Sequence, residues 1–265
     1  MDTQLLRKRF ALVGARVKVS RLDSGRARAG IDIRRDEEGE FFDIRLGLEE
    51  RVEYEVIDAQ PRLRHLLLMA RGGDFKEKFL CGHDERHWFV SAIPYAHVSS
   101  VTEAMWALQP FEVRQRVRRR VKRVKMRLRR RNKAFVRQGE WFFVPAEAGE
   151  TTRPTLLLRN VPLRRDDQSK PHVCEEMCIA TESARACDEY PNGVSEADYQ
   201  LLLRVNPLAR KWDWKPLKRR QLTYVRGRVS HPDHKTITLH GWHRALLNTE
   251  HAAPEPALER VVFYD

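Results

Sequence analysis

Apolar and polar residues alternate through much of the first half of the chain, which is the pattern of half-buried β-strands. The clearest case is RVEYEVIDA at 51–59, in which valine and tyrosine face one side and glutamate the other. Further strands are predicted at 10–20, 65–71, 77–82 and 88–94, with short connections. Sequential strands with brief connections favour an antiparallel meander. We therefore predict a β-rich half over residues 1–97.

A helical period replaces this alternation over residues 98–138. Ser100 and Glu103 fit a capping box, in which the serine accepts from a backbone N–H and the glutamate reaches back to the cap. This helix is expected to end near Gln109. Pro110 suits the first turn of a second helix, because its missing N–H costs nothing there.

The second helix is predicted to run from 112 to 133. Its apolar residues recur every three or four positions and form one narrow stripe: Val113, Val117, Val121, Val124 and Leu128. Arginine and lysine occupy most of the remaining positions. Like charges three or four residues apart repel, so this helix needs either docking of its valine stripe or an anion.

The remaining residues, 139–265, again predict strands, at 140–146, 155–160, 222–230 and 236–247, with a short helix capped by Ser195. The last two strands form a hairpin around the turn HPDHK. The predicted fold class is therefore α+β, an antiparallel-sheet-rich single unit. In it, a long basic amphipathic helix joins two β-rich halves.

The distribution of charge adds a functional prediction to the predicted fold, because most of the net positive charge lies in one segment. Residues 112–133 hold thirteen Lys or Arg and one acid, a charge of 13 − 1 = +12, while the whole chain carries +13. Such a run favours a polyanion partner, and nucleic acid first. The chain shows no zinc-finger spacing and no ribonucleoprotein signature, so RNA or a single strand is favoured over sequence-specific duplex. The candidate phosphate-binding residues are Arg116, Arg118, Arg119, Arg120, Lys122, Arg123, Lys125, Arg127, Arg129, Arg130, Arg131 and Lys133. An acidic protein or an anionic membrane surface is the alternative partner.

Two tryptophans followed by cations form a second candidate surface. Trp212 and Trp214 share one face of an extended segment, and Lys218, Arg219 and Arg220 follow. Aromatic rings among cations can stack the bases of single-stranded nucleic acid. The alternative is that both rings cover an edge of the core.

Histidines cluster in two predicted turns. The first cluster, HPDHKTITLHGWH, contains His231, Asp233, His234 and His240, and the second, GHDERH, contains His83 and His87. If the two meet, they are candidates for metal-assisted or general acid–base cleavage of phosphodiesters. The alternative is two ordinary polar turns, since no metalloenzyme spacing such as H-E-x-x-H is present.

A third candidate site is a histidine close to three cysteines. His172, Cys174, Cys178 and Cys187 could complete a tetrahedral zinc site, although their spacing is loose. Buried thiols that behave as small apolar residues are the alternative.

The remaining observations narrow the class of protein. No apolar run approaches the length of a membrane span, and four cysteines in 265 residues make no disulfide scaffold, so we expect a cytoplasmic protein. The segments RQGEWFFVP at 137–145 and Tyr224 to Glu250 resemble segments of bacterial proteins of uncharacterised activity. That resemblance implies no activity, cofactor or partner. Three hypotheses follow: a nucleic-acid-binding protein, a nuclease or other phosphodiesterase with zinc or another divalent metal, and a basic subunit of a larger ribonucleoprotein or defence-type assembly.

Overall fold

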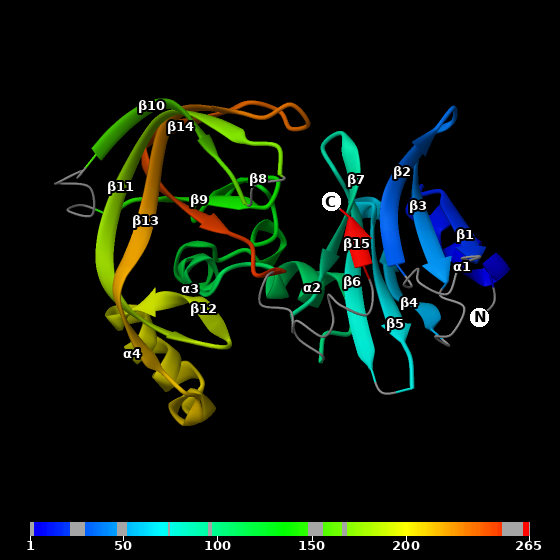
Figure 1. Cartoon of the computed structure of the whole chain (residues 1–265), viewed down its shortest axis with the longest axis horizontal. Helices are drawn as coiled ribbons and strands as arrows, with labels where there is room; N and C mark the ends of the chain where they lie inside the picture. Colours follow the sequence, from blue (N-terminus) through cyan, green and yellow to red (C-terminus); the bar gives the residue numbers. More distant parts are fainter. Residues whose placement is uncertain are drawn as a thin grey trace. The chain divides into compact units, whose positions relative to one another are not determined.

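The computed structural model describes residues 3–21, 30–46, 52–73, 75–94, 97–147, 156–165, 169–250 and 262–264. The chain divides into two compact units (Figure 1). Unit 1 comprises Met1–Gln109 together with Thr249–Asp265, and unit 2 comprises Pro110–Asn248.

Unit 1 contains two four-stranded sheets and two α-helices among its described residues. Its elements are α1 (Thr3–Leu12), β1 (Val17–Arg21), β2 (Gly30–Asp36), β3 (Gly39–Leu46), β4 (Glu53–Gln60), the 3₁₀-helix η1 (Pro61–Leu63), β5 (His65–Arg71), β6 (Lys76–Asp84), β7 (His87–Ala92), α2 (Val101–Ala107) and β15 (Val262–Tyr264). Strands β4 to β7 form an antiparallel meander, as predicted. The other sheet has the order β1-β3-β2-β15, in which β1 runs parallel to β3 and β15 runs parallel to β2.

Strand β5 of the meander is buried on both faces, which explains its unbroken apolar run. Leu66 and Leu68 join a core that also contains Phe10 of α1. Leu67 and Leu80 lie on the opposite face and belong to a second core, which is formed with α2. A strand covered on both sides has no polar face and therefore loses the period-two pattern.

Unit 2 contains a seven-stranded antiparallel sheet with short helices. Its elements are α3 (Phe111–Arg120), the 3₁₀-helix η2 (Val124–Met126), β8 (Val136–Gln138), β9 (Trp141–Pro145), β10 (Leu156–Leu163), β11 (His172–Cys187), β12 (Tyr190–Ser195), α4 (Glu196–Val205), the 3₁₀-helix η3 (Pro207–Lys211), β13 (Lys215–Ser230) and β14 (Ile237–Leu247). The strand order is β10-β11-β13-β14-β9-β8, and β12 pairs with β11.

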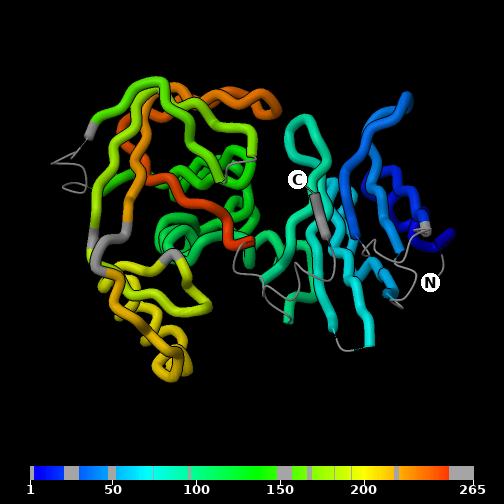
Figure 2. Tube along the Cα trace, in the orientation of Figure 1, coloured from blue at the N-terminus to red at the C-terminus, as the bar shows by residue number. Residues whose placement is uncertain are grey.

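The longest strands of this sheet are β11 and β13. Each is 16 residues long, and both curve along their length (Figure 1 and Figure 2). Their pairing contains two register shifts, and the pairing of β13 with β14 contains a third. Such irregularities increase twist and bend the strands that carry them.

The predicted long basic helix between two β-rich halves is wrong. Helix α3 is ten residues long and ends at Arg120, because Val121 adopts an extended conformation with φ −114° and ψ 93°. Val113, Val117 and Val121 are buried, but Val124 is 70% exposed, so the valine stripe is covered only as far as Val121. Repulsion among the successive arginines opposes any extension beyond that residue. In the described residues no α-helix exceeds ten residues, and the chain is mostly β.

The basic run after α3 is organised by Asn132 instead. The side-chain amide of Asn132 donates to the carbonyls of Met126 and Arg129 at 3.3 and 3.4 Å. Its side-chain oxygen accepts from the backbone N–H groups of Ala134 and Phe135 at 2.8 and 3.2 Å. These bonds close residues 126–135 into a compact turn, which presents its cations without a helix.

Other local predictions have mixed outcomes. The strand predicted at 10–20 begins too early, since Phe10 to Leu12 end helix α1. Ser100 caps α2 by accepting from the N–H of Glu103 at 3.2 Å, as predicted. The glutamate, however, reaches Ser99, whose N–H it accepts at 2.7 Å. Among the described helices none has the length and apolar character needed to cross a bilayer.

Candidate metal centre

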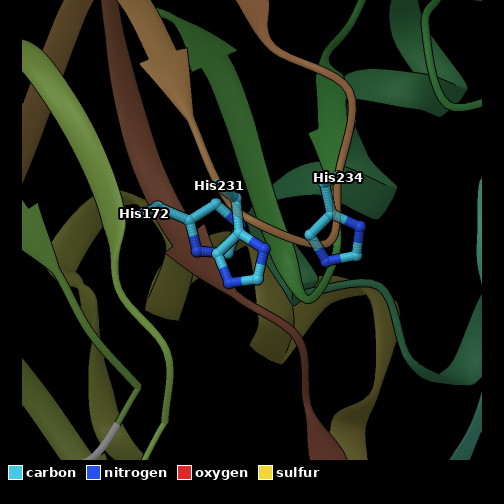
Figure 3. Close-up of side chains that lie close together, drawn as sticks. All are labelled: His172, His231 and His234. Atoms are coloured by element: carbon cyan, nitrogen blue, oxygen red, sulfur yellow. The ribbon is translucent and has the colours of Figure 1, made fainter.

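Three histidines meet at one end of the sheet of unit 2 (Figure 3). His172 is the first residue of β11, and His231 and His234 lie in the connection between β13 and β14. Val173 pairs with Ser230 in the antiparallel ladder, so the next position along places His172 opposite His231. Two long strands thus bring together residues that are far apart in the sequence.

The spacing of the three side chains suits one metal ion. One ligating nitrogen from each histidine lies within 4.8 Å of the other two. The ring centroids are 4.3 Å apart for His172 and His231, and 4.7 Å apart for His231 and His234. Zinc holds imidazole nitrogens at about 2.0–2.1 Å, which places two tetrahedral ligands roughly 3.4 Å apart. The rings stack with interplanar angles of 24–30°. Coordination therefore requires side-chain rotations that turn the nitrogens onto one point.

Two of the three rings carry buried nitrogens that lack hydrogen bonds. His172 is 1% exposed, and neither its Nδ1 nor its Nε2 has a partner among the described residues. The buried Nδ1 of His234 likewise has no hydrogen-bond partner among the described residues. Buried polar atoms are nearly always hydrogen-bonded, so exceptions of this kind call for a ligand or ion. A metal ion would satisfy one nitrogen of each ring.

His231 differs, because both of its ring nitrogens are engaged. Its Nδ1 accepts from the backbone N–H of Asp233 at 3.1 Å, and its Nε2 lies 3.2 Å from the carbonyl oxygen of Lys170. This pattern assigns the ring proton to Nε2. A proton held on a backbone carbonyl is the arrangement that orients metal-ligating histidines, and Nδ1 could bind a metal only by exchanging its hydrogen bond from the Asp233 N–H for the ion.

All three histidines are held in the neutral form. Burial, followed by the neighbouring rings, lowers the pKa of His172 to about 3. Burial, His231 and then Arg130 lower the pKa of His234 to about 4. Burial also lowers the pKa of His231, against the opposing effects of the Lys170 carbonyl and Asp233. Neutral imidazole is the form that binds metal, so no proton needs to leave at neutral pH.

The β8–β9 hairpin packs against the turn that carries His231 and His234. Gln138 is fully buried, and its side-chain amide donates to the carbonyls of Lys235 at 2.7 Å and Val229 at 3.4 Å. Gly139 follows it with φ +57° and lies against the ring of His234. These contacts anchor both sides of the turn that carries His231 and His234.

The structure places the predicted cysteine ligands elsewhere. Cys174 lies in the apolar core of the sheet, and Cys178 lies in a separate cluster with Leu222 and Tyr224. Burial raises the pKa of the Cys174 thiol to about 12 and, with Glu189, that of Cys187 to about 11. Of the four predicted ligands, the three thiols are outside the group of side chains that surrounds His172 in the described residues.

The remaining histidine candidates do not join this group. His240 lies exposed on β14. His83 and His87 belong to unit 1, where His87 Nδ1 contacts Glu40 at 2.5 Å and His83 stacks edge-on against Trp88. Asp233 stays close to the cluster and pairs with Lys170 at 2.8 Å.

The basic segment, residues 112–133, presents most of its cations to solvent. The exposed members are Arg118, Arg119, Arg120, Lys122, Arg123, Lys125, Arg129, Arg131 and Lys133. Arg116 and Arg127 serve the fold instead: Arg116 binds the Pro145 carbonyl and Glu147, and Arg127 binds the Val121 carbonyl. Arg130 is half-buried.

The two tryptophans predicted as a stacking surface pack within the protein. Trp214 stacks on Tyr190, meets the edge of Tyr199, and donates its indole N–H to the Ala209 carbonyl at 2.7 Å. Trp212 lies in the same apolar cluster. The side chains of Lys218, Arg219 and Arg220 lie outside the described residues.

Sequence reasoning missed Gln138 and Gly139 as supports for the site. The only signal was a glycine two residues before an apolar strand, which indicates a tight hairpin turn. Nothing in that signal pointed to the histidine turn. No protein-family model, curated protein or solved structure matches the chain.

Proposed function

We propose that unit 2 is a metal-dependent phosphodiesterase that acts on nucleic acid, with RNA or a single strand as the favoured substrate. The metal is a divalent transition metal, zinc first, held by His172, His231 and His234. The observation that carries the proposal is the set of buried imidazole nitrogens without partners in the described residues. Three neutral imidazoles suit zinc better than magnesium or calcium, which prefer oxygen ligands.

Three protein ligands are typical of catalytic rather than structural zinc sites, and an ion held by His172, His231 and His234 would keep room for a water molecule. Zinc lowers the pKa of such a water to about 7 and so supplies hydroxide at neutral pH. Hydrolysis of a phosphodiester at such a site would form one bond between a water oxygen and phosphorus and break one ester P–O bond, with solvent protonating the leaving oxygen.

The basic segment supports nucleic acid as the substrate. Its exposed cations, from Arg118 to Lys133, belong to the same compact unit as the three histidines. Each phosphate contact releases counterions and adds affinity at low salt. These side chains would hold the strand while the metal acts on one phosphate.

A cleavage assay tests the proposal. Metal-stripped protein is incubated with end-labelled RNA and single-stranded DNA, alone and with Zn²⁺, Mn²⁺ or Mg²⁺. We expect cleavage that requires a transition metal, stops with chelator, and falls at least a hundredfold in His172→Asn and His234→Asn. His240→Asn, an exposed histidine of β14, should retain full activity. Absence of cleavage under every metal, or equal cleavage by all three variants, would refute the assignment.

A second candidate function is nucleic-acid binding without cleavage, and the exposed cations of the basic segment favour it. Arg119, Arg123 and Arg129 replaced together by Ala should weaken RNA binding. The replacement should also reduce the log–log salt slope by up to about one for each phosphate that the variant no longer neutralises. An unchanged slope would remove the basic segment from binding.

A further inference from the structure

The imidazole of His231 belongs to a closed circuit of contacts with Lys170 and Asp233. Its Nε2 donates to the main-chain carbonyl of Lys170 at 3.2 Å, and its Nδ1 accepts from the backbone N–H of Asp233 at 3.1 Å. The ammonium group of Lys170 pairs with the carboxylate of Asp233 at 2.8 Å and closes the circuit. Lys170 therefore holds the histidine directly through its backbone and indirectly through its side chain.

This circuit extends the connection between β11 and β13 beyond the two strands. Val173 and Ser230 form the last pair of the β11–β13 ladder at the histidine end of the described residues. Lys170 comes before the first residue of β11, and His231 and Asp233 come after the last residue of β13. The contacts of Lys170 thus join the two chain segments where the ladder has ended.

The neighbours of Lys170 in the sequence restrict its backbone on both sides. Pro171 follows it, and the residue before a proline is confined to extended conformations. Ser169 precedes it and is tied to the residues that follow β10. The Oγ of Ser169 accepts from the N–H of Arg165 at 3.2 Å, and its carbonyl accepts from the side chain of Arg164 at 3.1 Å. The position of the Lys170 carbonyl is therefore set by the local chain.

A fixed ring matters most at His231, because this histidine must exchange a bond when it binds an ion. Its Nδ1 gives up the N–H of Asp233, whereas the contact of Nε2 with the Lys170 carbonyl does not involve the ligating nitrogen. A ring that is already oriented loses less freedom on binding than a mobile one. Contacts of this kind behind a ligating histidine typically change metal affinity by about ten- to a hundredfold.

We propose that Lys170 is a positioning residue for His231: its carbonyl keeps the ring proton on Nε2, and its ammonium group holds the turn at Asp233. The inference rests on the metal site proposed above and assigns part of the control of its affinity to a residue that is not a ligand. The Lys170 side chain is 65% exposed and its carbonyl survives any substitution, so removal of the charge should cost less than removal of the whole contact.

Two measurements on the intact chain test this role. In the metal-free protein, the imidazole ¹⁵N shifts report which nitrogen of His231 carries the proton, and the His231→Asn variant identifies the signal by its loss. We expect the Nε2–H form in the wild type and a mixture of both forms in Lys170→Met. In isothermal titration with Zn²⁺, Lys170→Met should bind about threefold to tenfold more weakly than the wild type.

Two further variants serve as controls. Lys170→Arg keeps the charge, so its zinc affinity should stay within about twofold of the wild type. Lys215→Met breaks a different exposed pair of unit 2, in which Lys215 lies 3.2 Å from Asp213. This variant should change neither the His231 spectrum nor the zinc affinity.

The outcomes separate this inference from the proposed function. An unchanged His231 spectrum in Lys170→Met, or a zinc affinity equal to that of the wild type, would overturn the positioning role. An equal loss of affinity in Lys170→Arg or in Lys215→Met would overturn it as well. If the wild type binds no zinc, the proposed function is refuted, and the spectra of the metal-free proteins still decide whether Lys170 fixes the ring of His231.

Discussion

Gly139 lies directly against the imidazole of His234. A Cβ built on the glycine would come 2.6 Å from Nε2, closer than two such atoms can approach, and the residue has φ +57°. The tight turn of the β8–β9 hairpin thus leaves room for the ring because position 139 has no side chain.

Substitution of Gly139 by Ala should therefore displace His234. We expect a loss of metal affinity of at least tenfold, in addition to a backbone cost of about 1–2 kcal/mol for the left-handed conformation. Gly241→Ala is the matched control, because Gly241 has φ +86° but no atom within 4 Å of an added Cβ. Isothermal titration with Zn²⁺ measures both variants. Equal affinities in the two would show that the close approach to His234 does not matter.

Gln138 should be needed to hold the histidine turn. Gln138→Leu removes the donor to the carbonyls of Val229 and Lys235 and should lower the free energy of unfolding by about 1–3 kcal/mol. Denaturant unfolding of the metal-free protein checks this value. Gln200→Leu, at an exposed position on α4, should change stability by less than about 0.5 kcal/mol. Similar losses in both variants would contradict the anchoring role.

Some elements of the fold could be predicted from the sequence, and others could not. Strand β5 and the cap at Ser100 depend on neighbouring residues, and local patterns predicted them. The long helix failed because its end depends on tertiary contacts: Val121 is buried but extended and ends the helix, and Val124 beyond it is exposed. Helical periodicity alone cannot show where that cover stops.

Only two of the three histidines of the candidate metal centre could be grouped together from the sequence. His231 and His234 were predicted together, since they share one turn. His172 was grouped instead with Cys174, its neighbour in the chain, because the true neighbour depends on the pairing of β11 with β13. Register across a sheet is set by turns and burial along both strands, and no local spacing encodes it.

The cysteines should be chemically inert in the folded protein. All four are buried and without disulfides, and burial raises the pKa of each thiol. Reaction requires the thiolate, so Ellman's reagent at pH 8 should modify the native protein slowly and the denatured protein rapidly at four sites. Added Zn²⁺ should leave the denatured-state count and the slow native rate unchanged. Rapid native labelling that zinc suppresses would instead assign the metal to the thiols.

Unit 1 should lose an ion-pair contribution in acid. Arg16 holds Asp36 through two bonds of 2.7 Å, and this pairing, followed by Lys18, lowers the pKa of Asp36. Because the folded-state pKa is lowered, the stabilisation is present above the ordinary aspartate value of about 3.9 and disappears as the pH falls below it.

The variant Asp36→Asn should therefore melt at a lower temperature than the wild type at pH 7, and the difference should shrink at pH values below about 3.9. Glu38→Gln affects the same arginine through a carboxylate that is 77% exposed, so it should have the smaller effect. Differential scanning calorimetry across this pH range measures both. A melting difference for Asp36→Asn that stays constant with pH would contradict the ion-pair explanation.

The most direct test of the metal centre is the zinc content of the intact chain after equilibration with Zn²⁺ and dialysis. Inductively coupled plasma mass spectrometry measures this content. The three-histidine site predicts about one zinc ion per chain in the wild type and in His240→Asn. It predicts less than about a tenth of that in His172→Asn and in His234→Asn, each compared at equal folded fraction. Zinc retained equally by all four proteins, or by none of them, would contradict the account.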